Sequence, residues 1–226
     1  MLTNIDTIIF DMDGTLLDSM GMWKDIDRVF LGKFNLECPK GFAKEIEGIG
    51  YEKLAAYFKK RFPVIAMTEE EIMEEWHQMS YEKYLYDTKL KNGALELLKY
   101  CKSNNIKTGI ATSNSLDLVE ASRKAHNLDS YIDVICTSNE VAHSKPAPDV
   151  YLAVANRLES KPENCLVFED ITAGIMAGKN AGMRTCFILD DASKYDWDEK
   201  KLLADFWIKD FTQVLDNTYY KRGELI

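Results

Sequence analysis

The stretch Ile8-Ile9-Phe10-Asp11-Met12-Asp13-Gly14-Thr15 places two carboxylates directly after three apolar residues. Two of these apolar residues are β-branched, which is typical of a buried strand. Asp11 and Asp13 are two residues apart, a spacing at which side chains leave an extended chain on the same side. Gly14 then allows a sharp turn and the close approach of a ligand. Because two neighbouring acids need a cation or a proton between them, we expect a divalent metal ion here.

A calcium loop and an ordinary acidic turn are the alternative interpretations of this Asp-x-Asp-Gly pattern. A calcium loop requires Gly at its sixth position and Glu at its twelfth. Counted from Asp11, Gly14 is fourth and Met22 is twelfth, so the pattern fails. An acidic turn stays possible for Asp-x-Asp alone. The apolar run before the two aspartates and the Gly-Thr pair after them favour a ligand site instead.

The bulk properties indicate a globular protein with a small-molecule partner. A length of 226 residues with 46% hydrophobic residues suits one large domain, or one domain with an insertion. The formal net charge of −9 argues against nucleic acid as the main partner, although it permits a small anionic substrate. The cysteines include no Cys-x-x-Cys pair, the N-terminus shows no signal peptide, and no apolar run reaches about 18 residues. We therefore expect a cytoplasmic monomer with no membrane segment.

Residues 17–87 have the periodicity of helices and no strand pattern. Leu54, Tyr57 and Phe58 form an i, i+3, i+4 stripe, and Thr68-Glu69-Glu70-Glu71 is a capping box that begins a further helix. The Met and aromatic residues at this spacing indicate packing between helices more than a cofactor site. We therefore expect residues 17–87 to be a helical insertion after the first strand.

From residue 88 onward, short apolar strands alternate with helices. Strands are expected at 5–11, 106–112, 131–137, 164–170, 184–189 and 205–209. Helices are expected at 92–101, 115–126, 148–158 and 171–181. This alternation predicts an α/β fold with a parallel sheet and right-handed crossovers. The acidic stretch 190–200 is expected to be a solvated loop.

Chemically active side chains follow four of the predicted strands, and ligands of such sheets bind beyond the carboxyl ends of the strands. Asp11 and Asp13 follow the first strand. Thr112-Ser113-Asn114 follows the second at the start of a helix, where free N–H groups and the helix dipole favour phosphate. Lys145 follows the third in a loop with two prolines, and Glu169-Asp170 ends the fourth. Each motif alone is weak, but all four in this order predict one site.

The four motifs together resemble those of the haloacid dehalogenase superfamily of phosphotransferases. Asp11-Met12-Asp13-Gly14-Thr15 matches the first motif, Thr112 the second, Lys145 the third and Glu169-Asp170 the fourth. The segments around the third and fourth motifs look like the branch that contains β-phosphoglucomutase and phosphoglycolate phosphatase. The resemblance covers nearly the whole chain.

This resemblance implies a Rossmann-like three-layer parallel-sheet core with an inserted α-helical cap. Residues 1–16 and 88–226 would form the core, and residues 17–87 would form the cap. Dehalogenases of the superfamily lack the second aspartate, so Asp13 argues against halide chemistry. We therefore expect phosphoryl transfer.

The resemblance also implies a reaction in two steps. Asp11 would attack phosphorus to form an aspartyl-phosphate, and Asp13 would protonate the leaving oxygen and then activate water. Lys145 and the segment Thr112-Ser113-Asn114 would stabilise the phosphoryl oxygens.

A Mg²⁺ ion is the implied cofactor. It would take the side chains of Asp11 and Asp170 and the backbone carbonyl of Asp13, with water and phosphate completing its oxygen ligands. Glu169 would be either a further ligand or a partner of the ligands.

A sugar phosphomutase is the main alternative to a phosphatase. The resemblance implies that a sugar phosphomutase carries a cap histidine and a cap arginine, which help to exclude water and hold a second phosphate. In this chain Trp23 stands at the histidine position and Tyr51 at the arginine position. The second phosphate therefore loses a charge-assisted contact of about 1.5–3 kcal/mol. Lys53 or Arg61 would have to compensate for this loss. We therefore predict hydrolysis of a small phosphorylated metabolite, with Trp23, Gly48 and Tyr51 as candidate substrate contacts. A protein that binds a phosphorylated effector without turnover is the remote alternative.

Overall fold

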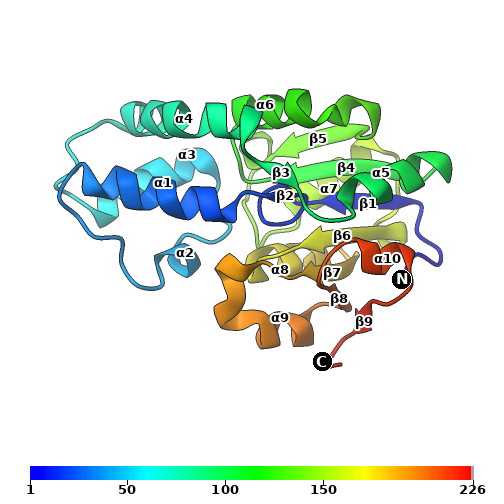
Figure 1. The fold of residues 1–226 in the computed structure, drawn as a ribbon. Coiled ribbons are helices and arrows are strands. Elements are labelled where there is room, and N and C mark those ends of the chain that lie inside the picture. The colour runs from blue at the N-terminus through cyan, green and yellow to red at the C-terminus, as the bar shows by residue number, and fades with distance from the viewer. Residues whose placement is uncertain (225–226) are drawn as a thin grey trace.

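A seven-stranded sheet organises the computed structural model, which describes residues 1–224 (Figure 1). The strand order is β5-β4-β1-β6-β7-β8-β9. The strands are β1 (Thr7–Phe10), β4 (Lys107–Thr112), β5 (Val134–Thr137), β6 (Cys165–Glu169), β7 (Arg184–Ile188), β8 (Phe206–Ile208) and β9 (Tyr220–Lys221). All pairs are parallel except β8 with β9. The predicted α/β fold is confirmed, and among the seven strands of this sheet β9 alone lies outside the expected strands.

Helices cover both faces of the sheet. Successive side chains of β1 point to opposite faces, and because they are apolar on both, each face is buried against helices. Ile8 and Phe10 belong to one core cluster with buried residues of α5, α6 and α10, whereas Ile9 belongs to another with α7 and α8. The helices of this part are α5 (Ala94–Ser103), α6 (Leu116–His126), α7 (Asp149–Arg157), α8 (Thr172–Asn180), α9 (Trp197–Leu203) and α10 (Thr212–Leu215). The core therefore has three layers.

Four further helices lie between β2 (Leu17–Asp18) and β3 (Lys89–Leu90), beyond one end of the sheet (Figure 1). They are α1 (Met20–Gly32), α2 (Phe42–Glu45), α3 (Tyr51–Arg61) and α4 (Glu69–Tyr86). Phe30, Phe58 and Trp76 meet edge to face, with ring centroids 4.8–6.0 Å apart. These aromatic residues pack between helices, as their spacing predicted.

The domain boundaries at 17 and 87 stay a prediction, and one local detail differs from the expected secondary structure. β2 pairs antiparallel with β3, so a short strand lies within 17–87, where none was expected. A pair of two-residue strands leaves too little pattern in a sequence to be recognised. Ser19 precedes α1 but does not cap it, because its hydroxyl donates to Asp13 instead. The capping box at Thr68 and Glu71 is confirmed.

The prediction of a solvated loop at 190–200 is wrong. The segment forms a 3-10 helix over Asp191–Asp196 and then enters α9. Lys200 is fully buried, and its ammonium lies 2.9 Å from a carboxylate oxygen of Asp196. The density of charged residues suggested exposure, but a pair of opposite charges can be buried together.

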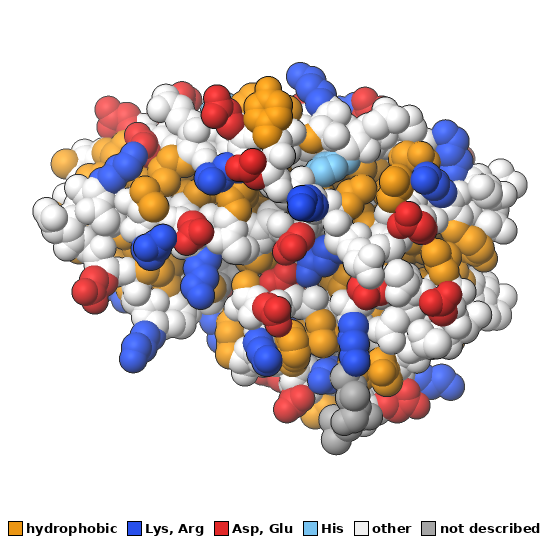
Figure 2. Space-filling view, in the orientation of Figure 1, with side chains coloured by type: hydrophobic (Ala, Val, Ile, Leu, Met, Phe, Trp, Pro, Cys, Tyr) orange, Lys and Arg blue, Asp and Glu red, His pale blue; other side chains and the backbone are white. Residues whose placement is uncertain are grey.

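The surface is mixed in charge. On the face drawn in Figure 2, Lys and Arg side chains are interspersed with Asp and Glu side chains. The cysteines are free thiols, and Cys136, Cys165 and Cys186 are buried. Within residues 1–224, no helix combines the length and the apolar character that crossing a bilayer requires.

Gly14 fixes the turn that follows β1. Its φ of +79° is a left-handed conformation that side chains disfavour. A Cβ atom at this position would lie 2.3 Å from Oδ2 of Asp170. The turn therefore brings the backbone of the first motif against the carboxylate of the fourth.

Gly14→Ala is expected to lower the free energy of unfolding by about 1–3 kcal/mol, because it adds backbone strain and a clash with Asp170. Urea and thermal unfolding measure this change. Gly21→Ala is the matched control, since an added Cβ there meets no heavy atom within 4 Å. Within α1 this control should be neutral or slightly stabilising. Equal effects of the two substitutions would contradict the proposed role of the turn.

Candidate active site

Neighbouring strands deliver the candidate site residues to one edge of the sheet. β1 lies between β4 and β6, and Phe10 is in register with Ile110 and Phe168. The residues that follow these strands therefore lie close together. Asp11 follows β1 and Asp170 follows β6, and both are buried, at 6% and 1% exposure.

Lys145 is the buried cation at this edge. Its ammonium lies 2.6 Å from Oδ1 of Asp11 and 2.5 Å from Oε1 of Glu169. Tyr151 donates to the same Glu169 oxygen at 2.7 Å, and the next two backbone amides donate to its Oε2. Both oxygens of Glu169 therefore have partners, and this carboxylate holds Lys145 toward Asp11.

Burial controls the ionisation of this cluster. Burial raises the pKa of Asp11 to about 8; Lys145 opposes this rise and Glu169 adds to it. Burial, with Glu169 and Asp11, also raises the pKa of Asp170 well above its usual range. Burial alone would lower the pKa of Lys145, but the carboxylates of Asp11 and Glu169 outweigh it and raise that pKa. Lys145 is therefore charged at neutral pH, whereas the carboxylates need further positive charge to ionise together.

The carboxylates of Asp11, Glu169 and Asp170 fit a divalent cation. One oxygen of each lies within 4.8 Å of the others. Oδ1 of Asp170 accepts a hydrogen bond from Thr15 at 2.8 Å, but its buried Oδ2 has no hydrogen-bond partner among residues 1–224. Buried polar atoms are rarely left without partners, and carboxylate oxygens are ligands that Mg²⁺ accepts. Since Glu169 is already paired at both oxygens, Asp11 and Asp170 are better placed to bind the cation.

Asp13 lies apart from this set, in a hydrogen-bond network of its own. Its Oδ1 accepts from the hydroxyls of Ser19, at 2.6 Å, and Tyr84, and its Oδ2 accepts from Nδ2 of Asn114 at 2.8 Å. β1 ends at Phe10, so the alternation of side chains along a strand does not extend to the two aspartates of the first motif. These aspartates therefore face different partners, although both line one cavity.

The last residue of β4 and the two residues after it supply hydroxyl and amide groups to the same cavity. Oγ1 of Thr112 accepts from the backbone amide of Asn114 at 3.1 Å. Oγ of Ser113 is buried, and it has no hydrogen-bond partner in the part of the chain that the structure describes. All three residues line the cavity, where a free hydroxyl suits an anionic ligand.

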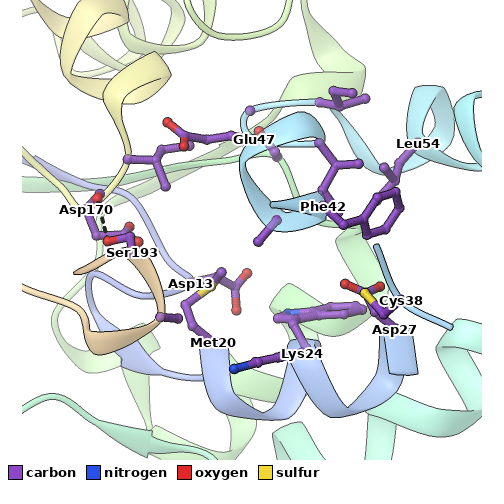
Figure 3. A pocket seen from close by; sticks show the side chains of 18 of the residues that line it. Asp13, Met20, Lys24, Asp27, Cys38, Phe42, Glu47, Leu54, Asp170 and Ser193 are labelled. Atoms are coloured by element: carbon purple, nitrogen blue, oxygen red, sulfur yellow. Dashed lines mark hydrogen bonds between the residues drawn. The ribbon is translucent and has the colours of Figure 1, made fainter. Parts of the chain in front are cut away.

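A cavity of about 690 Å³ extends from these residues to the helices between β2 and β3 (Figure 3). Trp23, Gly48 and Tyr51, the candidate substrate contacts, all line it. Nε1 of Trp23 donates to Tyr84 at 2.8 Å, and the hydroxyl of Tyr51 donates to the carbonyl of Met73 at 3.2 Å. Their polar atoms are engaged, so a ligand would meet their rings.

Several residues of the cavity were not identified from the sequence. Three of them, Met20, Lys24 and Asp27, come from α1, where they share one face at helical spacing with the predicted contact Trp23. The i, i+3, i+4, i+7 pattern could have found this face. Ser193 carried no such signal, since it lies in the segment expected to be a loop. Its hydroxyl donates to the carbonyl of Asp170 at 3.4 Å (Figure 3).

Asp27 is an acid within the helical part of the cavity. In Figure 3 it lies beside Cys38, on the opposite side of the view from Asp170 and Ser193. Burial raises the pKa of Asp27 to about 7, and no cation of residues 1–224 offsets this rise. The carboxyl group therefore suits a hydrogen-bond donor brought by a ligand.

A family model of haloacid dehalogenase-like hydrolases matches residues 8–188. The chain belongs to this family. The matched range begins in β1, ends with β7 and includes all four motifs. The resemblance inferred from the motifs is confirmed.

Relatives of this haloacid dehalogenase-like hydrolase span most of its length. A probable pseudouridine-5'-phosphatase of Drosophila melanogaster is 29% identical over 196 residues, 84% of this chain and 84% of that protein. β-Phosphoglucomutase from Clostridium difficile has a TM-score of 0.76 at 25% identity, with 93% of each chain covered. CbbY from Rhodobacter sphaeroides, in complex with phosphate, has a TM-score of 0.82 at 23% identity, over 93% of this chain and 96% of that one. The likeness to CbbY shows the shared fold.

The stability of Asp27→Asn relative to the wild type is expected to rise between pH 5 and pH 8. The folded wild type keeps this carboxyl protonated up to about pH 7, whereas the unfolded chain ionises it near pH 4. The folded state therefore binds more protons in this window, and the wild-type free energy of unfolding falls as the pH rises.

Urea unfolding of both proteins at the two pH values measures the effect, which should reach about 1–3 kcal/mol. Asp25→Asn, at an exposed position of the same helix, is the control and should change much less. A difference between Asp27→Asn and the wild type that is the same at both pH values would contradict the raised pKa of this acid.

Proposed function

We propose that the protein is a Mg²⁺-dependent phosphatase that hydrolyses a small phosphomonoester, such as a sugar phosphate, through an aspartyl-phosphate. The observation that carries this proposal is the buried contact between Asp11 and Lys145, beside an Asp170 oxygen with no partner among residues 1–224. Membership of the family and the phosphatase names of relatives support a phosphoric monoester hydrolase. Phosphatases of this family use a divalent metal, and the acidic set fits one.

Asp11 is the proposed nucleophile. Its Oδ1 is held by Lys145 at 2.6 Å, which leaves the other carboxylate oxygen available to attack phosphorus. As this O–P bond forms, the bond from phosphorus to the leaving oxygen breaks, and the Lys145 ammonium stabilises charge on the transferred group. A divalent cation bound by Asp11, Asp170 and the carbonyl of Asp13 would supply the positive charge that lets a weakly basic carboxylate attack.

Asp13 is the proposed acid and base. It gives its proton to the leaving oxygen in the first step. In the second step it takes a proton from water, whose oxygen attacks phosphorus while the bond to Asp11 breaks. Both aspartates then return to their starting states.

The rest of the cavity would receive the substrate. Thr112, Ser113 and Asn114 would contact the phosphoryl oxygens through hydroxyl and amide groups. The leaving group would extend toward the helices, along the rings of Trp23 and Tyr51 and past Gly48. The lining residue Asp27 would accept a hydrogen bond from its far end.

A sugar phosphomutase stays the second candidate, because β-phosphoglucomutase is among the similar structures. The proposal favours hydrolysis because the residues considered as substitutes for the missing arginine are engaged elsewhere: Lys53 donates to Ser144 and Arg61 pairs with Glu45. A mutase would depend on the cationic residues that line the cavity, which are Lys24, Arg28 and Lys40. Incubation with β-glucose 1-phosphate and trace bisphosphate separates the candidates. Release of free phosphate supports hydrolysis, and glucose 6-phosphate without free phosphate would identify a mutase.

Asp11→Asn is expected to lower the turnover of p-nitrophenyl phosphate with Mg²⁺ at least about 1,000-fold, because an amide cannot replace the nucleophile. Asp170→Asn is expected to raise the Mg²⁺ concentration for half-maximal activity about 10–100-fold. Steady-state assays over a Mg²⁺ titration measure both changes.

Asp198→Asn is the control for these variants, because the Asp198 side chain is 88% exposed and has no proposed role in the reaction. It should keep wild-type activity. If Asp11→Asn turned over p-nitrophenyl phosphate as fast as the wild type, the proposed reaction through Asp11 would be contradicted. If the wild type itself showed no turnover, a protein that binds a phosphorylated ligand without catalysis would be favoured.

A further inference from the structure

Tyr84 is a buried residue of α4 that was not identified from the sequence. Its side chain is fully buried, and its hydroxyl lies between groups from three other parts of the chain. Nε1 of Trp23 and Nδ2 of Asn114 each donate to this hydroxyl at 2.8 Å. The hydroxyl also forms a hydrogen bond with Oδ1 of Asp13.

The directions of these hydrogen bonds are fixed by chemistry. The indole N–H of Trp23 and the amide nitrogen of Asn114 can only donate. The amide of Asn114 cannot be reversed without loss, because its Oδ1 accepts from the backbone N–H of Ser115 at 2.8 Å. The Tyr84 hydroxyl thus accepts two hydrogen bonds, and its single hydrogen is left for Asp13.

Asp13 is therefore held from three directions. Ser19 and Tyr84 donate to its Oδ1, and Asn114 donates to its Oδ2. Asn114 follows a strand of the sheet, whereas Tyr84 lies on a helix between β2 and β3. The orientation of this carboxyl group thus depends on how α4 sits against the edge of the sheet.

We propose that Tyr84 is a positioning residue that aims the carboxyl group of Asp13 at the leaving oxygen. This inference rests on the proposed function, in which Asp13 is the proton donor. The terminal torsion of an aspartate is broad and two-fold, so hydrogen bonds and not rotamer preference set the direction of its oxygens. A proton donor must lie within hydrogen-bond reach of the leaving oxygen, and a small rotation removes it from that reach. Tyr84 fixes that rotation from the side of the helices.

The experiment compares two esters that differ in their need for a proton donor. p-Nitrophenyl phosphate releases a stable phenolate, whereas benzyl phosphate releases an alkoxide of similar size that must be protonated as it leaves. The value of kcat/KM covers the steps up to departure of the leaving group. General acid catalysis contributes about 100- to 10,000-fold, so misdirection of the acid has a large effect for the second ester.

Tyr84→Phe is expected to lower kcat/KM for benzyl phosphate about 10–100-fold and for p-nitrophenyl phosphate less than about 3-fold. Tyr86→Phe removes the same hydroxyl from the same helix, at a position that is 80% exposed, and should leave both values unchanged. Thermal unfolding of each variant establishes that it is folded at the assay temperature.

Asp13→Asn distinguishes failure of this inference from failure of the proposed function. Asp13→Asn is expected to lower kcat/KM more for benzyl phosphate than for p-nitrophenyl phosphate. If Asp13→Asn shows this difference and Tyr84→Phe does not, Tyr84 does not position the acid. An equal loss for both esters in Tyr84→Phe identifies a structural role and overturns the inference. If Asp13→Asn itself affects both esters equally, its role as proton donor is removed, and the inference falls with it.

Discussion

Three carboxylates are buried together at the edge of the sheet, and the one buried ammonium beside them, that of Lys145, contacts only two, Asp11 and Glu169. This imbalance of charge is the constraint on which the site depends. When ionised, Asp11, Glu169 and Asp170 carry −3 and Lys145 carries +1, which leaves −2 in a region shielded from water. Removing ions from water costs several kcal/mol for each ion unless they are paired. The site can meet this cost by taking up protons, as the raised pKa values of Asp11 and Asp170 indicate, or by binding a divalent cation. A site that needs a cation in order to ionise is suited to metal-dependent chemistry on phosphate.

The topology explains how residues so distant in the sequence meet. β1 is an interior strand of the sheet, between β4 and β6, so the first motif lies beside the second and the fourth. The turn at Gly14 then carries the chain away from the edge and into the helices that close the cavity. Through Tyr84 these helices also hold Asp13, whereas Asp11 is held by Lys145, so the proposed nucleophile and the proposed proton donor differ in their contacts with the helices.

The sequence predicted the fold and the site to different depths. The six parallel strands of the main sheet could be predicted because each is a short apolar run, whereas β2, β3 and β9 were too short to be recognised. The meeting of Asp11, Lys145 and Asp170 followed from the rule that ligands of such sheets bind beyond the carboxyl ends of the strands. The partners of Asp13 could not be predicted, because Tyr84 is 71 residues away and its helix shows only packing periodicity. The burial of Lys200 was also missed: its pairing with Asp196 is local, at i, i+4, but burial of the pair depends on tertiary packing and not on composition.

Chemical trapping of the covalent intermediate tests the central claim most directly. Protein turning over p-nitrophenyl phosphate with Mg²⁺ is quenched with borohydride, which reduces an aspartyl-phosphate to homoserine, and the digested chain is read by mass spectrometry. The account predicts homoserine at position 11 when both substrate and Mg²⁺ are present, and unmodified Asp11 when either is left out. Trapping at another residue, or active turnover with no modification at position 11, would contradict it.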